Sequence, residues 1–133
     1  MALSMAQKRC GRLILDATIN DNSVELFNKL GWLPIDDIVR FRKLCMLHKV
    51  SQGHFPEYFS SYFKYVRSTR SYCTRSAICN GVLTPSCKRN SGLRTFHSSA
   101  RRLWNKLGNS FRNITSHSNF KITSLKNFIK ENT

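Results

Sequence analysis

Basic side chains and one aromatic ring alternate in the middle of the chain, in a pattern that could bind phosphate groups. A guanidinium group can pair with two phosphate oxygens at once, and a tyrosine ring can stack on an unpaired base. The candidate nucleic-acid-binding residues are Arg67, Arg70, Tyr72, Arg75, Lys88, Arg89 and Arg94. Such contacts recognise phosphate before they distinguish one base sequence from another. We therefore expect RNA or DNA, held through its phosphates, as the partner.

Positive charge is concentrated in the second part of the chain. Residues 58–130 contain fourteen Lys or Arg and no Asp or Glu, whereas residues 1–57 contain eight basic and six acidic side chains. The formal net charge of +15 therefore comes almost wholly from the second part. A field of this sign attracts phosphate and releases the counterions of nucleic acid. Charge alone fits a solvated basic surface equally well.

The one pair of adjacent carboxylates, Asp36-Asp37, has the residue type that holds Mg²⁺ in a polymerase. It follows Pro34, however, and precedes an apolar helical pattern, and acids in the first turn of a helix stabilise its positive end. Acidic residues are so few elsewhere that no third carboxylate is expected to join the pair. The pair is predicted to open a helix, and neither an enzyme activity nor a catalytic residue is expected.

Cysteine and histidine do not form a recognisable metal or catalytic site. Cys73, Cys79, Cys87 and His97 are separated by gaps of five, seven and nine residues. Structural zinc ligands usually come in pairs about two to four residues apart. The four histidines have no Ser or Cys partner at a recognisable spacing for nucleophilic catalysis. No metal, cofactor or small-molecule substrate is expected.

Cysteine usage and hydropathy indicate where the protein resides. Five cysteines without a CxxC pair, and without a secretory apolar segment before them, predict a reducing intracellular compartment, the nucleus or the cytoplasm. No apolar run approaches the roughly 20 residues of a membrane span, so no membrane partner is expected. The basic N-terminus, which has no acid before Asp16, also fits a mitochondrial transit peptide, the less favoured alternative.

Apolar spacing predicts the helices that must position these residues in the N-terminal half. Spacings of three and four indicate helices over residues 3–15, 23–30 and 35–52, and a short helix over 56–63. In the first helix the apolar residues Leu3, Ala6, Cys10, Leu13 and Ile14 fall on one face. For the second helix, Asn22 is the predicted N-cap and Gly31 the left-handed stop.

The remainder of the chain is less regular. Residues 68–99 contain seven Ser and four Thr and recurrent turn signals. Short strands at 77–84 and 93–97 could pair as a hairpin, and an irregular loop is equally expected. Helices are predicted again at 99–107, with Trp104 on the apolar face, and at 118–130. The inner side of the last helix is predicted to carry Ile122, Leu125, Phe128 and Ile129.

The predicted fold is therefore mainly α. It has a helical N-terminal segment (1–63), a basic region rich in Ser, Thr and Arg that is irregular or holds a short β-hairpin (64–98), and two C-terminal helices (99–133). Together these make one domain or fragment.

Several segments of the chain occur together, in this order, in one protein family. They are ELFNKLGWLP (25–34), RKLCMLHKV (42–50), PEYF (56–59), TRS (74–76), FHSSARRLWN (96–105), and SNFK (118–121) followed by LKNFI (125–129). Together they resemble the C-terminal region of LINE-type (non-LTR) retrotransposon reverse transcriptases, downstream of the polymerase domain. The resemblance implies that this region helps to hold template RNA or target DNA, and it carries over no catalytic residue.

Two positions depart from the family's pattern. The family usually has Leu-Pro where this chain has Leu107-Gly108, and it spaces the final Phe and Leu by four residues, whereas Phe120 and Leu125 are five apart. The extra residue is expected to rotate Phe120 off the apolar stripe unless Ile122 replaces it.

The sequence thus favours a non-catalytic nucleic-acid-binding fragment, a truncated piece of a reverse transcriptase without its catalytic domain. One alternative is a structural remnant that packs on a polymerase domain of the parent protein, and another is an imported mitochondrial basic protein. A large exposed apolar patch on residues 3–15 or 38–50 would favour a missing protein partner.

Overall fold

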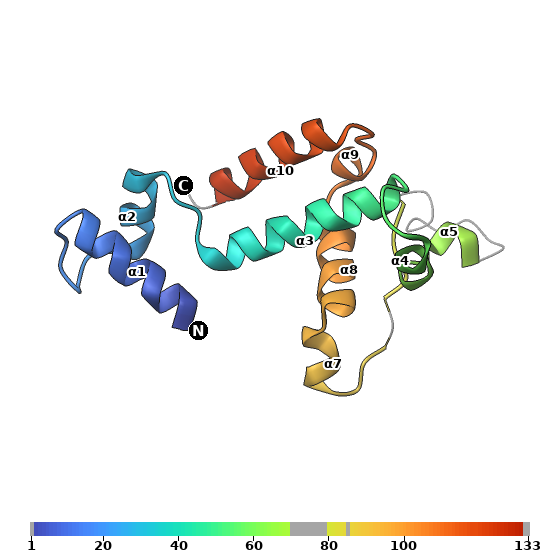
Figure 1. Cartoon of the computed structure of the whole chain (residues 1–133), viewed down its shortest axis with the longest axis horizontal. Coiled ribbons are helices and arrows are strands. Elements are labelled where there is room, and N and C mark those ends of the chain that lie inside the picture. Colours follow the sequence, from blue (N-terminus) through green and yellow to red (C-terminus); the bar gives the residue numbers. More distant parts are fainter. Residues whose placement is uncertain (1, 70–79, 85, 132–133) are drawn as a thin grey trace.

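The computed structural model describes residues 2–69, 80–84 and 86–131. This part of the chain is mainly helical and has essentially no strand, which confirms the predicted fold class. The helices in chain order are α1 (Ala2–Ile14), α2 (Ser23–Leu30), α3 (Ile35–Ser51), α4 (Glu57–Tyr62), α5 (Val66–Thr69), α7 (Asn90–Arg94), α8 (Phe96–Lys106), α9 (Asn109–Arg112) and α10 (His117–Glu131). Figure 1 shows α3 as the central helix, with α10 alongside it and α8 crossing it.

Local sequence signals define the ends of α2 as predicted. The backbone N–H of Val24 donates to the Asn22 side chain at 3.1 Å, which satisfies one donor of the first turn. At the other end Gly31 has φ +64°, and the N–H of Trp32 donates to the Phe27 carbonyl at 2.8 Å. Glycine adopts this left-handed conformation without the strain that a Cβ atom would cause.

Helix α3 begins after Pro34, and Asp36 and Asp37 lie in its first turn, as predicted. Asp37 is buried and forms an ion pair with Arg40 at 3.0 Å. Both carboxylates lie near the positive end of the helix, where negative charge is favourable. The acidic pair therefore belongs to a helix start.

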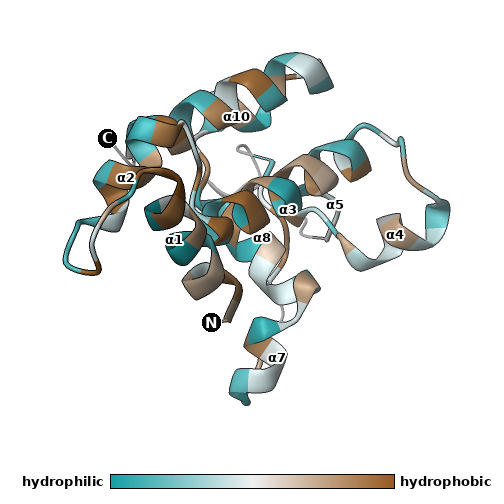
Figure 2. Cartoon of the chain, turned by 60° about the vertical axis from the view of Figure 1, so that its left-hand side comes forward, coloured by the Kyte–Doolittle hydropathy of each residue, from teal (hydrophilic) through white to brown (hydrophobic). Residues whose placement is uncertain are grey.

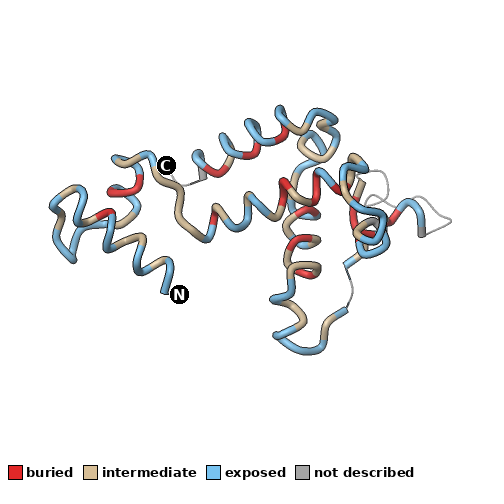
Figure 3. The backbone as a smooth tube through the Cα atoms, viewed as in Figure 1, coloured by how far each residue is buried: buried red, intermediate tan, exposed pale blue. Residues whose placement is uncertain are grey.

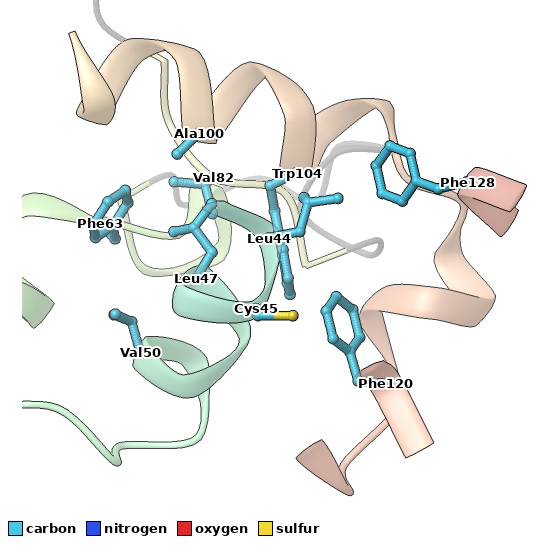
Figure 4. Close-up of a cluster of buried hydrophobic side chains, with 10 residues drawn as sticks. All are labelled: Leu44, Cys45, Leu47, Val50, Phe63, Val82, Ala100, Trp104, Phe120 and Phe128. Atoms are coloured by element: carbon cyan, nitrogen blue, oxygen red, sulfur yellow. The ribbon is translucent and has the colours of Figure 1, made fainter. Parts of the chain in front are cut away.

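The main core forms where α3, α8 and α10 meet (Figure 4). Its fully buried members include Leu44 of α3, Trp104 of α8 and Phe120 of α10. The complete cluster is Leu44, Cys45, Leu47, Val50, Phe63, Val82, Ala100, Trp104, Phe120 and Phe128. Trp104 is thus a core residue, and its ring centroid lies 6.1 Å from that of Phe120.

The buried face of α10 includes Phe128, as predicted, but otherwise differs from the predicted one. Phe120, Ser124 and Phe128 are buried, whereas Ile122 and Ile129 are about half exposed. Spacings of four place the three buried residues on one side of the helix. Phe120 packs against Trp104 and stacks on His48, with centroids 4.2 Å apart. The prediction that Phe120 leaves the stripe was wrong, because these partners come from distant parts of the chain.

Helix α1 presents its apolar stripe to solvent. Leu13 and Leu3 are 82% and 71% exposed, and the buried residue of α1 is Gly11, which lies outside this stripe. Gln7 fixes this orientation: its amide nitrogen donates to the Leu33 carbonyl, and its amide oxygen accepts from the Ile35 N–H, both at 2.8 Å. Figure 2 shows the apolar residues at both ends of α1, and Figure 3 shows how little of this helix is buried.

The predicted β-hairpin is absent from the part of the chain that is described. Residues 93–97 lie in α7 and the start of α8, so the predicted strand there was wrong. Residues 80–84 instead pair with 64–66 through one isolated antiparallel bridge, Tyr65 to Val82. Asn105 of α8 secures this segment, since its side chain accepts from the Val82 N–H at 2.9 Å and donates to the Val82 carbonyl at 2.7 Å. The Asn105 side chain thus satisfies the Val82 backbone groups that a second neighbouring strand would otherwise bind.

The aromatic set made up of the residues of α4 and of Phe63, which follows it, is only partly buried. Phe63 is buried in the core and Phe59 packs against it, whereas Tyr58 and Tyr62 are exposed. None of the helices in the described ranges is long and apolar enough to cross a membrane.

Candidate nucleic-acid interface

Arg67 and Arg112 line one cavity of about 400 Å³. The two residues are 45 positions apart, and α5 and α9 bring them to the same place. The remaining lining residues supply hydroxyl groups, amides and two aromatic rings: Ser51, Gln52, Tyr65, Ser68, Asn80 and Trp104. No carboxylate is among the described residues of this wall. The cavity therefore combines two positive side chains with many hydrogen-bonding groups.

The bridge between residues 64–66 and 81–83 places Arg67. The N–H of Val66 donates to the Gly81 carbonyl, and that of Leu83 to the Lys64 carbonyl, both at 2.9 Å. The Ser68 hydroxyl donates to the Tyr65 carbonyl at 2.9 Å and tightens the start of α5. Arg67 projects from this turn and is exposed. An exposed guanidinium on a fixed turn can reach a phosphate without losing an internal contact.

Asn80 holds the adjacent wall through two contacts. Its carbonyl accepts from the Trp104 indole N–H at 3.1 Å, and its side-chain nitrogen donates to the Asn113 side chain at 3.1 Å. Trp104 lines the cavity but is only 1% exposed, so its ring is not accessible for stacking on a base. The indole N–H is satisfied internally, as is usual for a buried tryptophan.

Arg112 has part of its donor set committed to the backbone. Its Nε and Nη2 atoms donate to the Leu107 carbonyl at 2.9 and 2.6 Å. This contact orients the guanidinium plane at the end of α8.

Burial raises the pKa of Tyr65, although a hydrogen bond with Ser51 opposes that effect. Tyr65 therefore remains a neutral phenol at physiological pH.

The structure does not bring all the predicted binding residues together. Lys88, Arg89 and Arg94 are exposed around α7, and Figure 1 shows α7 well apart from α5. Arg102 of α8 is exposed as well. Arg70, Tyr72 and Arg75 lie outside the described residues.

Arg101, the residue before Arg102 in α8, makes contacts within the fold. Its Nη2 atom donates to the Tyr62 carbonyl, and its guanidinium lies 5.3 Å from the centre of the Phe63 ring. Desolvation by burial lowers the pKa of Arg101. A positive side chain that is engaged in this way is a poorer phosphate ligand than an exposed one.

Sequence reasoning identified Arg67 but missed Arg112, Tyr65 and Asn80. The sequence around Arg112 does not alternate several basic residues with aromatic ones, as the sequence around Arg67 does. Only the fold therefore relates Arg112 to Arg67. Asn80-Gly81 is one of the turn signals within residues 68–99, and Asn80, with φ +50°, lies beside Trp104. In the described ranges no group of three or more His, Cys, Asp or Glu is arranged to hold a metal ion. Cys73 and Cys79 lie outside these ranges.

Comparisons with models of known protein families, with curated proteins and with solved structures find no match to this chain. The resemblance to the C-terminal region of reverse transcriptases therefore stays a prediction from the sequence.

Proposed function

We propose that this chain is a non-catalytic nucleic-acid-binding fragment, corresponding to the C-terminal region of a non-LTR retrotransposon reverse transcriptase without its catalytic domain. The observation that carries the proposal is the cavity between Arg67 and Arg112. Both arginines line this cavity, and no carboxylate is among its described lining residues.

The wall of this cavity suits a sugar–phosphate backbone better than a single small substrate. Arginine forks bind phosphate oxygens, and the neighbouring hydroxyl and amide groups can bind sugar and phosphate. Most of the lining residues belong to residues 58–130, which contain no Asp or Glu, so the surrounding field also attracts a polyanion. Binding of this kind is largely independent of base sequence.

The proposal is tested by the affinity for labelled single-stranded RNA over a range of salt concentrations. Replacing Arg67 by Gln removes one exposed charge, and the salt slope should flatten by roughly 0.7 if one single-strand phosphate contact is lost. Arg9→Gln is the matched control, because Arg9 is exposed on α1 in the less basic half of the chain. Equal slopes for the parent chain and both variants would contradict the proposal.

A second candidate function, a structural piece that packs on the polymerase domain of the parent protein, is favoured by the outward stripe of α1. Leu3, Leu13 and Ile14 are all more than half exposed on one helix. Exposed apolar patches often mark protein interaction sites. If this stripe covers a protein surface, Leu3→Gln with Leu13→Gln should abolish self-association or dye binding by the isolated chain and leave RNA binding unchanged.

A further inference from the structure

A second cavity, of about 350 Å³, lies between α3 and α10, and its wall combines the apolar side chains of Phe41, Met46 and Phe55 with positive ones. Arg42 and Lys49 come from α3, and Lys121 comes from α10. His117, at the start of α10, and the thiol-bearing Cys45 of α3 also line it. No carboxylate is among the described residues of this wall. The cavity shares no residue with the one around Arg67.

Helical geometry places these charges on facing sides of the two helices. Arg42 and Lys49 are seven residues apart, which is about two turns of α3. His117 and Lys121 are four residues apart, so they are neighbours on the surface of α10. Four groups that are positive or can become so therefore converge on one volume.

Two titratable groups in the wall respond to the same charges. Burial raises the pKa of the Cys45 thiol, while Lys121, Arg42 and Lys49 act in the opposite direction. Burial lowers the pKa of His117, and Lys121, His48, Lys49 and His54 lower it further. The potential in the cavity is thus positive, and a bound anion would neutralise it.

The first turn of α10 strengthens this conclusion. A helix N-terminus favours negative charge, yet this first turn contains no acidic residue. His117 lies at its beginning and Lys121 follows the turn directly, and positive charge on either side chain is unfavourable near a positive helix end. An anion held beside the first turn would interact favourably with the helix dipole and with both side chains.

The orientation of His117 follows from its contact with His48. His48 Nε2 lies 2.7 Å from the Ile114 carbonyl and must carry a hydrogen to donate to it. In neutral His48 the Nδ1 atom is then an acceptor, so His117 Nδ1, at 3.2 Å, carries the hydrogen between the rings. His117 Nε2 is buried and has no hydrogen-bond partner among the described residues. This nitrogen can take up a proton when an anion arrives.

We propose that the cavity between α3 and α10 binds a phosphate group, with Arg42, Lys49 and Lys121 as its ligands and His117 as a proton acceptor at its edge. The phosphate can belong to a free phosphate ester or to the backbone of a nucleic acid. The proposal goes beyond the Arg67 site, because it names a separate binding place with its own residues.

The test follows the imidazole signals of the full chain by NMR while inorganic phosphate is added at constant ionic strength. His117→Asn identifies the signal of His117. A saturable shift of this signal, with a rise of the His117 pKa on binding, is expected. Lys49→Gln with Lys121→Gln should weaken binding roughly tenfold or more, because charge-assisted hydrogen bonds are lost.

Lys126→Gln with Lys130→Gln is the matched control. Both lysines are exposed on α10 and line neither of the two cavities, and the charge removed is the same. This variant should bind phosphate within about twofold of the parent, since screening weakens distant surface charges. Absence of a saturable shift in the parent, or equal weakening in the two double variants, would overturn the proposal.

A short single-stranded RNA then distinguishes the source of the phosphate. Competition between the RNA and inorganic phosphate for the His117 signal would assign the cavity to a nucleic-acid backbone. Phosphate binding that the RNA leaves unchanged would assign it to a free phosphate ester. Arg67→Gln should not alter the phosphate titration in either case, so a failure of the Arg67 site and a failure of this one are distinguishable.

Discussion

His48 and His117 meet with their Nδ1 atoms 3.2 Å apart and their ring centroids 5.3 Å apart. The contact joins the last turns of α3 to the first residue of α10. His48 is fully buried, and it stacks on Phe120 of the core. At this distance only one of the two Nδ1 atoms can carry a hydrogen. The protonation state of the pair therefore affects how well the two helices pack together.

Acid should destabilise the fold through His117. Its pKa in the folded chain is lowered, whereas an unfolded histidine titrates near about 6.5. Below that pH the unfolded chain binds a proton that the folded chain resists, so stability is full above this pH and falls as the pH drops toward the lowered value. Urea unfolding between about pH 7.5 and 5.5 should show this loss.

The variant His117→Asn should remove most of that pH dependence. His54→Asn is the control, since His54 is exposed and contributes only one of the charges that act on His117. A parent chain whose unfolding midpoint is constant over this range would show that the histidine pair does not control stability.

Leu44 should be among the most sensitive positions of the core. It is 2% exposed at the centre of α3 and lies in the cluster with Trp104 and Phe128. Leu44→Ala should cost about 2–5 kcal/mol of unfolding free energy, since it removes buried methyl groups and leaves a cavity. Val39→Ala, on the exposed side of the same helix, should cost much less. An unchanged melting profile for Leu44→Ala would mean that the isolated chain does not form this core.

Two glycines of the N-terminal helices should respond in opposite ways to alanine. At Gly11 of α1 a Cβ atom would lie 3.5 Å from Leu30 and Phe27, an ordinary contact distance. Gly11→Ala should therefore stabilise the protein by roughly 0.5–1 kcal/mol through helix propensity. Gly31→Ala should destabilise by about 1–2 kcal/mol, because φ +64° strains any residue with a Cβ. Thermal unfolding compares the two, and a loss of stability in Gly11→Ala would argue against the packing of α1 on α2.

Local chemistry explains which parts of this fold the sequence predicts well. The ends of α2 depend on Asn22 and Gly31, whose effects act within a few residues, and both were recognised. The acidic start of α3 is local in the same sense. The buried face of α1 and the buried face of α10, in contrast, depend on residues far away in the sequence. Gln7 acts on residues 33–35, and Phe120 packs on Trp104 and His48, so only the tertiary fold determines which side is buried.

In the candidate binding sites too, some residues can be predicted from the sequence and others are related only by the tertiary fold. An exposed arginine such as Arg67 can be recognised from composition, because charge acts over long range and needs no exact partner. Arg112 and the cavity between α3 and α10 depend on which helices become neighbours. No periodicity in the sequence relates Lys49 to Lys121, since five other helices of the described structure, and the residues between α5 and Asn80, lie between them in the sequence.

The arginine-rich segment around α5 supplies the last prediction. Arg67 lies beside the cavity, and Arg70 and Arg75 follow it in the sequence. Replacing all three by Gln should weaken binding to unrelated RNAs by similar factors, and each lost contact should flatten the log–log salt slope by roughly 0.7–0.9. Tyr72→Ala should weaken single-stranded more than duplex ligands, because only unpaired bases can stack on the ring.

The matched control for the triple variant removes Lys8, Arg9 and Arg12 from α1, again as glutamines. The loss of formal charge is identical, so a nonspecific effect of net charge would appear in both variants. Fluorescence anisotropy with single-stranded and duplex RNA at several salt concentrations measures both slopes. If the two triple variants lose affinity and slope equally, the positive field of the whole chain accounts for binding. A larger loss in the Arg67, Arg70 and Arg75 variant would assign the phosphate contacts to this segment.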